Sequence, residues 1–285
     1  MKAFIYGQKW RVEHDVYITK LFKKLKDLDI QFKVYSEFNK QIIGHNSENE
    51  TLTTHEELKV FAPDVIITLG GDGTILSAMT LIRELELPIM GLNLGRLGFL
   101  ASIEQARIDQ AIELFVEGKY TISKRSMLKM QSDPIAFTDN NFALNDFTIL
   151  KRDNSSMIVL HTYIDGEFLN SYCADGLIVS TPTGSTGYSL SCGGPIIFPS
   201  SDNFILTPVA PHNLNVRPIV ISSGHEISFK IEGRSENFLC TMDSRYEVIT
   251  SEHEISIKKN HFSFVRFHIS PFNSPVGGRN CIERK

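Results

Sequence analysis

The sequence lacks the features that would mark a membrane-bound, secreted or metal-clustered protein. No apolar run among its 285 residues approaches the ~18 that a membrane span needs. The opening MKAFIYGQKW has no apolar core of a secretory signal. The four cysteines, at positions 173, 192, 240 and 281, form no CxxC pair, which favours free thiols over a disulfide framework or zinc site. We therefore expect a cytoplasmic protein that does not bind membranes.

Charge and histidine spacing exclude two further classes. The net charge of −4 provides no basic surface for nucleic acid. The nine histidines include no HxxxH or HExxH spacing, so they do not indicate a zinc enzyme. A chain of 285 residues, 42% hydrophobic, predicts a globular protein of about two domains.

The stretch DVIITLGGDGT, residues 64–74, predicts a buried strand that leads into a glycine turn and then a helix. This geometry places backbone N–H groups and a helix N-terminus against phosphate. Two common phosphate motifs are absent. A GxGxxG motif would need glycine at Leu76, and no lysine between Pro63 and Pro88 could complete a P-loop. The turn is therefore a phosphate-binding loop of a third kind.

Asp72 lies among the three glycines of this turn, where an unshielded carboxylate would repel phosphate. Three explanations remain open from residue type alone. Asp72 could act beside a metal ion, accept a proton, or merely cap the helix or fix the turn.

The first half of the chain alternates strands with helices, which predicts a Rossmann-like α/β domain with a parallel sheet covered on both faces. A polar stretch without periodicity, residues 44–57, predicts a surface loop. The other expected elements are strands at residues 2–6, 31–35, 65–69 and 88–93 and helices at 14–28, 74–85 and 108–115.

From about residue 121 helical periodicity fades, and short β-rich runs predict an all-β, sandwich-like second domain. Inside one such run, Asn145 and Asp146 are adjacent polar residues and should face opposite sides of a strand. The expected strands are residues 127–131, 142–151, 157–164, 176–180, 219–222, 226–231, 238–241 and 254–258.

Residues 175–195, DGLIVSTPTGSTGYSLSCGGP, are rich in glycine, serine and threonine. So many hydroxyls in one loop favour a polar ligand over a purely structural turn. Tyr188 could stack on a base, with Thr186 beside it to hydrogen-bond, although a core tyrosine is an equally good interpretation.

These motifs resemble the NAD kinase family. GGDGT at residues 70–74 resembles the phosphate-donor motif that this family shares with diacylglycerol, sphingosine and 6-phosphofructokinases. NLGRLGFL at residues 93–100, ALND at 143–146, STPTGSTGYSLS at 180–191 and APHNLNVRPIVI at 210–221 narrow the resemblance to NAD kinases, over residues 4–267.

The resemblance implies transfer of the γ-phosphate of ATP to the 2′-hydroxyl of the adenosine ribose of NAD, with Asp72 as general base and with a divalent cation, expected to be Mg²⁺. It implies an α/β domain at residues 1–122, onto which residues 261–285 pack back, and a β-rich NAD-binding domain at 123–260. It also implies a homodimer or homotetramer, with the NAD site near the subunit interface. The substrate-binding residues that it implies are Gly70, Gly71, Gly73, Thr74, Asn145, Asp146, Asp175, Thr186, Gly187, Tyr188, Ser189, Ser191 and Ala210.

The chain departs from the family at a few positions. Cys173 occupies a position that is often basic, and Gly187 replaces the alanine of the usual TAYS. Arg245 could supply the missing positive charge to NAD or form a surface salt bridge instead. Two other functions remain open: a lipid kinase, which would need an apolar membrane element, and a non-catalytic NAD-binding sensor, which would not need Asp72.

Overall fold

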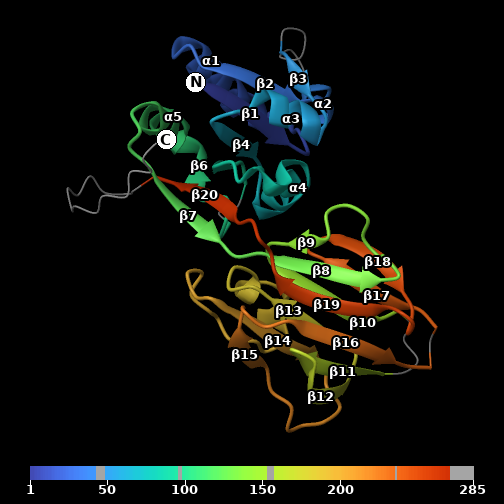
Figure 1. The fold of residues 1–285 in the computed structure, drawn as a ribbon. Coiled ribbons are helices and arrows are strands. Elements are labelled where there is room, and N and C mark those ends of the chain that lie inside the picture. Colours follow the sequence, from blue (N-terminus) through green and yellow to red (C-terminus); the bar gives the residue numbers. More distant parts are fainter. Residues whose placement is uncertain (43–48, 96–97, 153–156, 235, 270–285) are drawn as a thin grey trace.

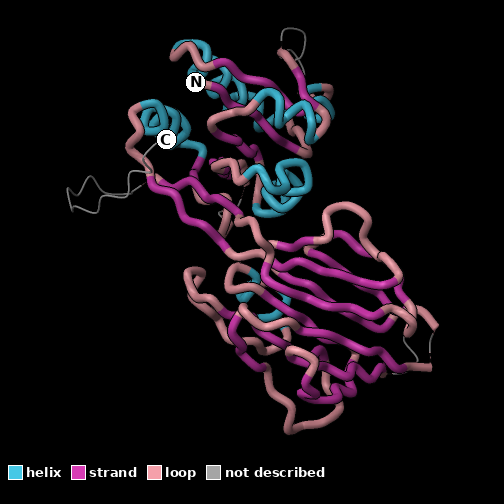
Figure 2. Tube along the Cα trace, viewed as in Figure 1, coloured by secondary structure: helices cyan, strands magenta, loops and turns pink. Residues whose placement is uncertain are grey.

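A computed structural model of the chain describes residues 1–42, 49–95, 98–152, 157–234 and 236–269. It has two lobes, an α/β lobe and a β lobe, joined by two adjacent connections (Figure 1). Figure 2 shows that helices gather in the first lobe and strands dominate the second. The expected fold class is confirmed.

The first lobe is built on one sheet of strand order β3-β2-β1-β4-β5-β20-β7, with β6 paired to β5. All its pairings are parallel except that of β7, which runs antiparallel to β20 at the edge. The bounds are β1 Lys2–Gly7, β2 Gln31–Tyr35, β3 Thr51–Leu52, β4 Val65–Leu69, β5 Ile89–Asn93, β6 Ile103–Glu104, β7 Thr121–Arg125 and β20 Phe264–His268.

Helices cover both faces of this sheet because their apolar residues recur every three or four positions. Helices α1 (Asp15–Asp27) and α5 (Ile108–Val116) pack on one face, where α1 buries Ile18, Leu21 and Leu25. Helices α3 (His55–Phe61) and α4 (Asp72–Ile82) pack on the other. The shorter helices of the first lobe are η1 Val12–His14, α2 Ser36–Asn39, η2 Arg83–Leu85 and η3 Gln105–Arg107. Two more, η4 Gly184–Thr186 and α6 Tyr188–Ser191, lie between β13 and β14 in the second lobe.

The second lobe consists of two six-stranded antiparallel sheets, of order β15-β14-β13-β10-β17-β18 and β12-β11-β16-β19-β8-β9. Alternate residues point into the space between them; Ile227, Phe229 and Ile231 of β16 are buried there. The bounds are β8 Leu128–Asp133, β9 Phe142–Ala143, β10 Asp146–Lys151, β11 Ile158–Ile164, β12 Glu167–Ala174, β13 Gly176–Ser180, β14 Asn203–Val209, β15 Ile219–Ser222, β16 Ile227–Glu232, β17 Phe238–Met242, β18 Arg245–Ile249 and β19 Glu254–Lys259.

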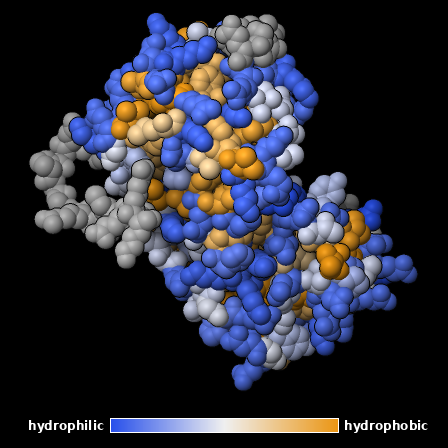
Figure 3. Space-filling model, turned by 45° about the horizontal axis from the view of Figure 1, so that its top comes forward, coloured by the Kyte–Doolittle hydropathy of each residue, from blue (hydrophilic) through white to orange (hydrophobic). Residues whose placement is uncertain are grey.

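The two lobes share part of one apolar core. Met127, Phe142, Leu144 and Phe262 belong to the same buried cluster as Ile75 and the rest of the buried face of α4. On the face drawn in Figure 3, hydrophobic residues gather along the middle of the molecule. Among the described residues, every helix is too short or too polar to cross a lipid bilayer.

Three sequence-based expectations differ from the structure. The loop expected at residues 44–57 contains β3 and the start of α3 instead, while residues 43–48 lie outside the described residues. A capping box explains α3: the Thr54 hydroxyl accepts from the Glu57 amide, and Glu57 accepts from the Thr54 amide. The single strand expected at 142–151 is divided between β9 and β10. The strands that were not expected are β6, β7, β12, β14, β18 and β20.

Most of residues 261–285, the returning segment, lies outside the described residues; its described part contains β20, which completes the first sheet.

Candidate functional site

Asp72 is the first residue of α4, at the carboxyl end of β4, but it does not cap the helix. Its carboxylate instead accepts three backbone hydrogen bonds from the next loop. The Phe99 amide donates to Oδ2 at 2.9 Å, and the Leu100 and Ala101 amides donate to Oδ1 at 3.0 and 2.9 Å. A Cβ on Gly98 would lie 2.2 Å from Oδ1, so glycine is needed there for this close approach. Asp72 therefore orders residues 98–101 and remains half-buried.

The three glycines around Asp72 differ in what they permit. Gly70 has a φ of 151°, which other residues rarely adopt, and a Cβ there would lie 2.2 Å from the Thr74 hydroxyl. A Cβ on Gly71 or Gly73 would meet nothing within 4 Å. Packing does not demand glycine at these two positions. The space in front of the N-terminus of α4 is open to an approaching ligand.

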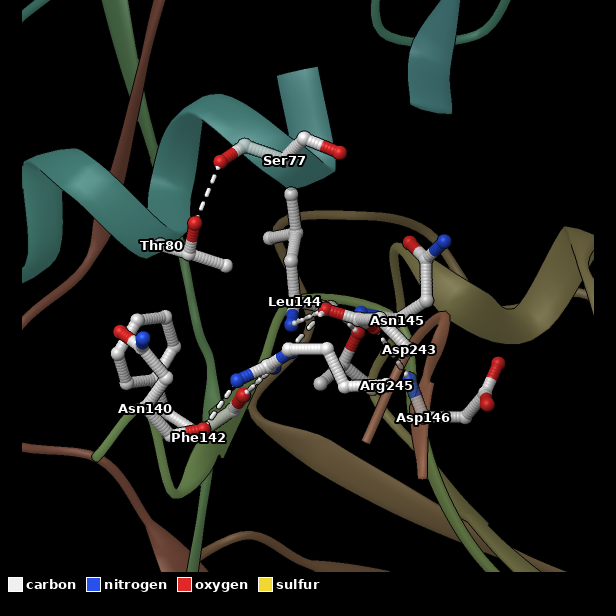
Figure 4. A network of polar contacts seen from close by, with 10 residues as sticks. Ser77, Thr80, Asn140, Phe142, Leu144, Asn145, Asp146, Asp243 and Arg245 are labelled. Carbon is white, nitrogen blue, oxygen red and sulfur yellow. Dashed lines mark hydrogen bonds and ion pairs between the residues drawn. The ribbon is translucent and has the colours of Figure 1, made fainter. Parts of the chain in front are cut away.

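Residues 144–146 of the second lobe lie close to α4. Leu144 is fully buried in the same apolar cluster as Ile75 and Met79 of α4. In Figure 4, Leu144 points toward the α4 ribbon, while the side chains of Asn145 and Asp146 point away from the surrounding polar network. Asn145 and Asp146 were expected in one continuous strand at residues 142–151. They lie instead where the chain turns between β9 and β10.

The turn at residues 144–146 is held by Asp243, a residue that the sequence did not single out. The Asp243 carboxylate accepts from the amides of Leu144, Asn145 and Asp146 at 2.9, 2.8 and 3.2 Å. Its side chain is only 6% exposed. Burial raises the pKa of Asp243, and the amide hydrogen bonds oppose that rise. Asp243 follows β17 with a φ of 52° and resembles an ordinary turn residue in sequence.

Arg245 completes this network. Its guanidinium donates to the carbonyls of Asn140 and Phe142, stacks on the Phe142 ring at 5.3 Å and lies 4.0 Å from the Asp243 carboxylate (Figure 4). Burial lowers the pKa of Arg245. The side chain is thus committed to the turn. Of the two roles that the sequence left open, a charge for NAD and a surface salt bridge, these contacts favour an ion pair, although a largely buried one.

Asp146 is buried beside the hydroxyl-rich loop. Burial, and then the nearby Asp243 carboxylate, raise the pKa of Asp146 to about 7. A Cβ on Gly187 would lie 3.9 Å from Oδ2 of Asp146. The Tyr188 pKa is raised by burial and, to a lesser extent, by Cys192, Asp146 and Asp175. The structure therefore brings Asp146, Asp175, Gly187 and Tyr188 into one neighbourhood.

Replacing Asp146 with asparagine should change how stability depends on pH. The unfolded carboxyl has a pKa near ~3.9, against about 7 when folded, so between these values the folded protein holds a proton that the unfolded chain has released. The free energy of unfolding therefore falls as pH rises through this window, by up to about 1.4 kcal/mol per pH unit. Asp146→Asn removes this term, so urea midpoints should increasingly favour the variant from pH 5 to pH 7. Parallel profiles in the two proteins would contradict the raised pKa of Asp146.

The hydroxyl-rich loop is tied to residues 144–146 by backbone contacts. The Thr181 hydroxyl donates to the Leu144 carbonyl at 2.6 Å, and the Thr181 amide donates to the Asn145 carbonyl at 2.9 Å. A Cβ on Gly184 would lie 2.1 Å from the Asn145 carbonyl oxygen. Part of this loop's polarity is therefore structural, as for Ser189, which is fully buried with its hydroxyl 2.8 Å from that of Thr207.

The remaining expected binding residues lie on three segments: the hydroxyl-rich loop, the end of β14 and the start of α4. Thr186 is half-buried and Tyr188 is 38% exposed, while Ser191 and Ala210 are exposed. Thr74 is buried under the glycine turn, with its amide donating to the Gly71 carbonyl at 3.0 Å.

Asp175 is paired with Lys151, another residue that the sequence did not single out. The Lys151 ammonium lies 2.7 Å from Oδ1 of Asp175, and both side chains remain partly exposed. Lys151 ends β10, the strand that Asp146 begins. The residues that the structure describes include no group of three His, Cys, Asp or Glu side chains able to hold a metal ion.

Comparison with known proteins identifies the family. A family model described as ATP-NAD kinase N-terminal domain matches residues 13–120, and one described as ATP-NAD kinase C-terminal domain matches residues 144–268. The chain is 44% identical over 273 residues to the NAD kinase of Cytophaga hutchinsonii, covering 94% of this chain and 93% of the relative. It is 45% identical over 268 residues to that of Flavobacterium psychrophilum, covering 92% and 90%.

Solved structures agree in fold. An NAD kinase from Archaeoglobus fulgidus in complex with ATP superposes with a TM-score of 0.75 at 27% identity, covering 94% of each chain. The yeast NADH kinase complexed with NADH gives a TM-score of 0.82 at 23% identity, covering 95% of this chain and 84% of the other, and shows the fold alone. On the two matched domain models and these relatives, the chain belongs to the NAD kinase family.

Proposed function

We propose that this NAD kinase transfers the γ-phosphate of ATP to the 2′-hydroxyl of the adenosine ribose of NAD, with Asp72 as the general base. The ribose oxygen forms a bond to the γ-phosphorus as the bond to the β–γ bridging oxygen breaks and ADP leaves. The hydroxyl proton passes to the Asp72 carboxylate.

The observation that carries this proposal is that Asp72 lies between two glycines, Gly71 and Gly73, whose backbone a ligand can approach. Gly71 and Gly73 leave room at the N-terminus of α4, where N–H groups and the helix dipole attract phosphate. Leu144 packs in the same cluster as the buried face of α4 and so holds Asn145 and Asp146 near that helix. A ribose bound by the second lobe can thus meet a phosphate bound by the first.

The second lobe supplies the dinucleotide contacts in this proposal. The Asn145 amide and the Asp146 carboxylate hold ribose hydroxyls and adenine, and Tyr188 stacks on the adenine with Thr186 beside it. Asp175 and Ser191 lie toward the nicotinamide half, and Ala210 lines the pocket. The partly exposed Tyr188 and its electrostatic proximity to Asp146 and Asp175 support this arrangement.

A divalent cation, which we assign as Mg²⁺, accompanies the ATP. The side chains around Asp72 suit a cation that arrives with the nucleotide better than a cation bound permanently by the protein. The described residues offer no carboxylate cluster, and the Asp72 oxygens already accept from three amides. When bound, the cation offsets the charge of the phosphates, which provide its ligands together with water.

We also propose a homodimer or homotetramer of the cytoplasm, with the NAD site near the subunit interface. Ile196, Phe198 and Leu214 are 67, 81 and 85% exposed, and large apolar side chains of this kind favour contact with a second copy. Cys173, Cys192 and Cys240 are free thiols, which suits a reducing compartment.

The experiment that tests the function is NADP formation by the purified protein from NAD, with ATP, inorganic polyphosphate and no donor in parallel. We expect NADP only when a donor and a divalent cation are present. NAD binding without NADP formation would instead support the sensor alternative, and no observation favours that alternative or a lipid kinase.

A further inference from the structure

Two arginines share one face of the strand pair β7 and β20. In the antiparallel register Phe264 lies opposite Arg125, and Arg266 lies opposite Ser123. Directly paired residues and residues two apart point to the same side of a sheet. Phe264 packs in the cluster with α4, whereas Phe267 packs on the opposite face with α5. Arg125 and Arg266 therefore emerge on the side of the sheet that carries α4.

Neither guanidinium has an anionic partner among the described residues. Arg125 makes no hydrogen bond or ion pair there, and Arg266 makes a single hydrogen bond, to the Ser102 hydroxyl at 2.8 Å. The Nε atoms of both arginines are buried without a partner. Each arginine pKa is lowered chiefly by burial, and that of Arg266 is lowered further by Arg125. The two cations thus lie within electrostatic range of one another.

His268 extends this group without adding charge. Its Nε2 lies 2.7 Å from the Ser123 hydroxyl. Burial, and then Arg266 and Arg125, lower the pKa of His268 to about 4, so the imidazole is neutral at pH 7. The groups that contact these side chains are neutral: the Ser102 hydroxyl contacts Arg266, and the Ser123 hydroxyl contacts His268. The one carboxylate within electrostatic range that the described chain offers is Asp72, which acts on Arg266 without a direct contact.

A half-buried pair of unneutralised cations is unfavourable on its own, because desolvation and mutual repulsion both oppose it. An anion with several negatively charged oxygens would offset both the desolvation of the two guanidiniums and their mutual repulsion. Guanidinium groups bind such oxygens in a planar, often bidentate geometry, and phosphate oxygens match it. The group therefore has the chemistry of a phosphate-chain site.

This arginine pair adjoins the Asp72 loop. Ser102, which binds Arg266, directly follows the three residues whose amides bind Asp72. The Asp72 carboxylate also raises the Arg266 pKa, against the larger effect of burial, so the two groups are electrostatically coupled. An anion held by the pair would lie beside the carboxylate that we assign as the base.

We propose that Arg125 and Arg266 bind the phosphate chain of the donor nucleoside triphosphate, an assignment that rests on the proposed function of Asp72. The alternative phosphate source, the pyrophosphate of the dinucleotide, fits less well. The expected dinucleotide contacts come from residues 145–146 and 175–191 of the second lobe, whereas both arginines belong to the sheet of the first.

The test compares the double variant Arg125→Gln/Arg266→Gln with wild type and with Lys124→Gln. Lys124 is the matched control, because it lies next to Arg125 on the opposite face of β7, is itself exposed and pairs with the partly exposed Glu86 at 2.9 Å. We expect the KM for ATP to rise about 10- to 100-fold in the double variant, as for lost charge-assisted hydrogen bonds, with the KM for NAD within about twofold. Lys124→Gln should change neither.

Direct binding gives a second reading that does not depend on turnover. Inorganic tripolyphosphate, titrated calorimetrically without divalent cations, should bind wild type and Lys124→Gln at least about tenfold more tightly than the double variant. Unchanged ATP KM and tripolyphosphate affinity, or a rise confined to the NAD KM, would overturn the proposal.

Two further controls keep these outcomes interpretable. If the glutamine variants do not fold, Arg125→Lys/Arg266→Lys is used with the same criteria, because it keeps the charge but loses the bidentate geometry. A wild-type protein that makes no NADP would refute the proposed function, whereas an active wild type with unaffected arginine variants would refute only the arginine site.

Discussion

Replacing Asp72 with asparagine is expected to lower kcat by about a thousandfold while the KM for NAD changes little. A positioned general base contributes roughly 10²- to 10⁴-fold to a proton-transfer step, and the amide of asparagine cannot accept the ribose proton. Steady-state NADP formation at saturating ATP and NAD measures the effect. An Asp72→Asn variant with undiminished kcat would remove Asp72 from the chemistry.

The three amide hydrogen bonds to Asp72 require a control, because the variant also disturbs residues 98–101. Gly98→Ala provides it. The added Cβ would lie 2.2 Å from Oδ1 of Asp72 and must displace the loop, yet the carboxylate remains. We expect a loss of kcat of about tenfold or less, below the range for a lost base. A loss as large as that of Asp72→Asn would make Asp72 a positioning residue for the loop.

Replacing Asp243 with alanine is expected to lower the free energy of unfolding by about 3–5 kcal/mol. The change leaves the amides of residues 144–146 without their acceptor and leaves Arg245 buried without its carboxylate, the situation in which lost buried partners are most costly. Urea unfolding at pH 7 measures the loss. Since the turn carries Asn145 and Asp146, the KM for NAD should rise in any Asp243→Ala protein that folds.

Asp165 offers a matched control for Asp243. It has the same residue type, a φ of 51° against 52°, and also accepts a backbone amide, from Glu226 at 2.8 Å. Its side chain, however, is 54% exposed, so water can replace the lost contact. Asp165→Ala should therefore be much less destabilising. Equal losses in the two variants would show that the backbone conformation, and not burial, determines the cost at Asp243.

The fold could be predicted from the sequence where each element carries its own pattern. The alternation of strands and amphipathic helices identified the first lobe, and the β-rich runs identified the second. Two of the misplaced elements lack a local apolar period, whereas β14, NFILTPV, is apolar and was missed all the same. β3 is two residues long, and α3 begins in a polar segment whose helical signal is the Thr54–Glu57 capping box.

The candidate site was predictable where chemistry depends on residue type at fixed spacing, as at Gly70–Thr74. It was not predictable where function depends on partners distant in sequence. Asp243 meets residues 144–146 nearly a hundred positions away, and Arg125 meets the strand of Arg266 through the pairing of β7 with β20. The contacts of Arg245 with Asn140 and Phe142 could not be predicted for the same reason, because these residues lie more than a hundred positions away.

The two connections between the lobes run side by side. Arg125 lies opposite Phe264 in the first sheet, and Leu128 lies opposite Lys259 in the second. The β lobe is thus inserted into the α/β lobe through two adjacent crossings of the chain. Any displacement of one lobe relative to the other must therefore bend both crossings together, so a sugar carried by one lobe is tied twice to the lobe that carries Asp72.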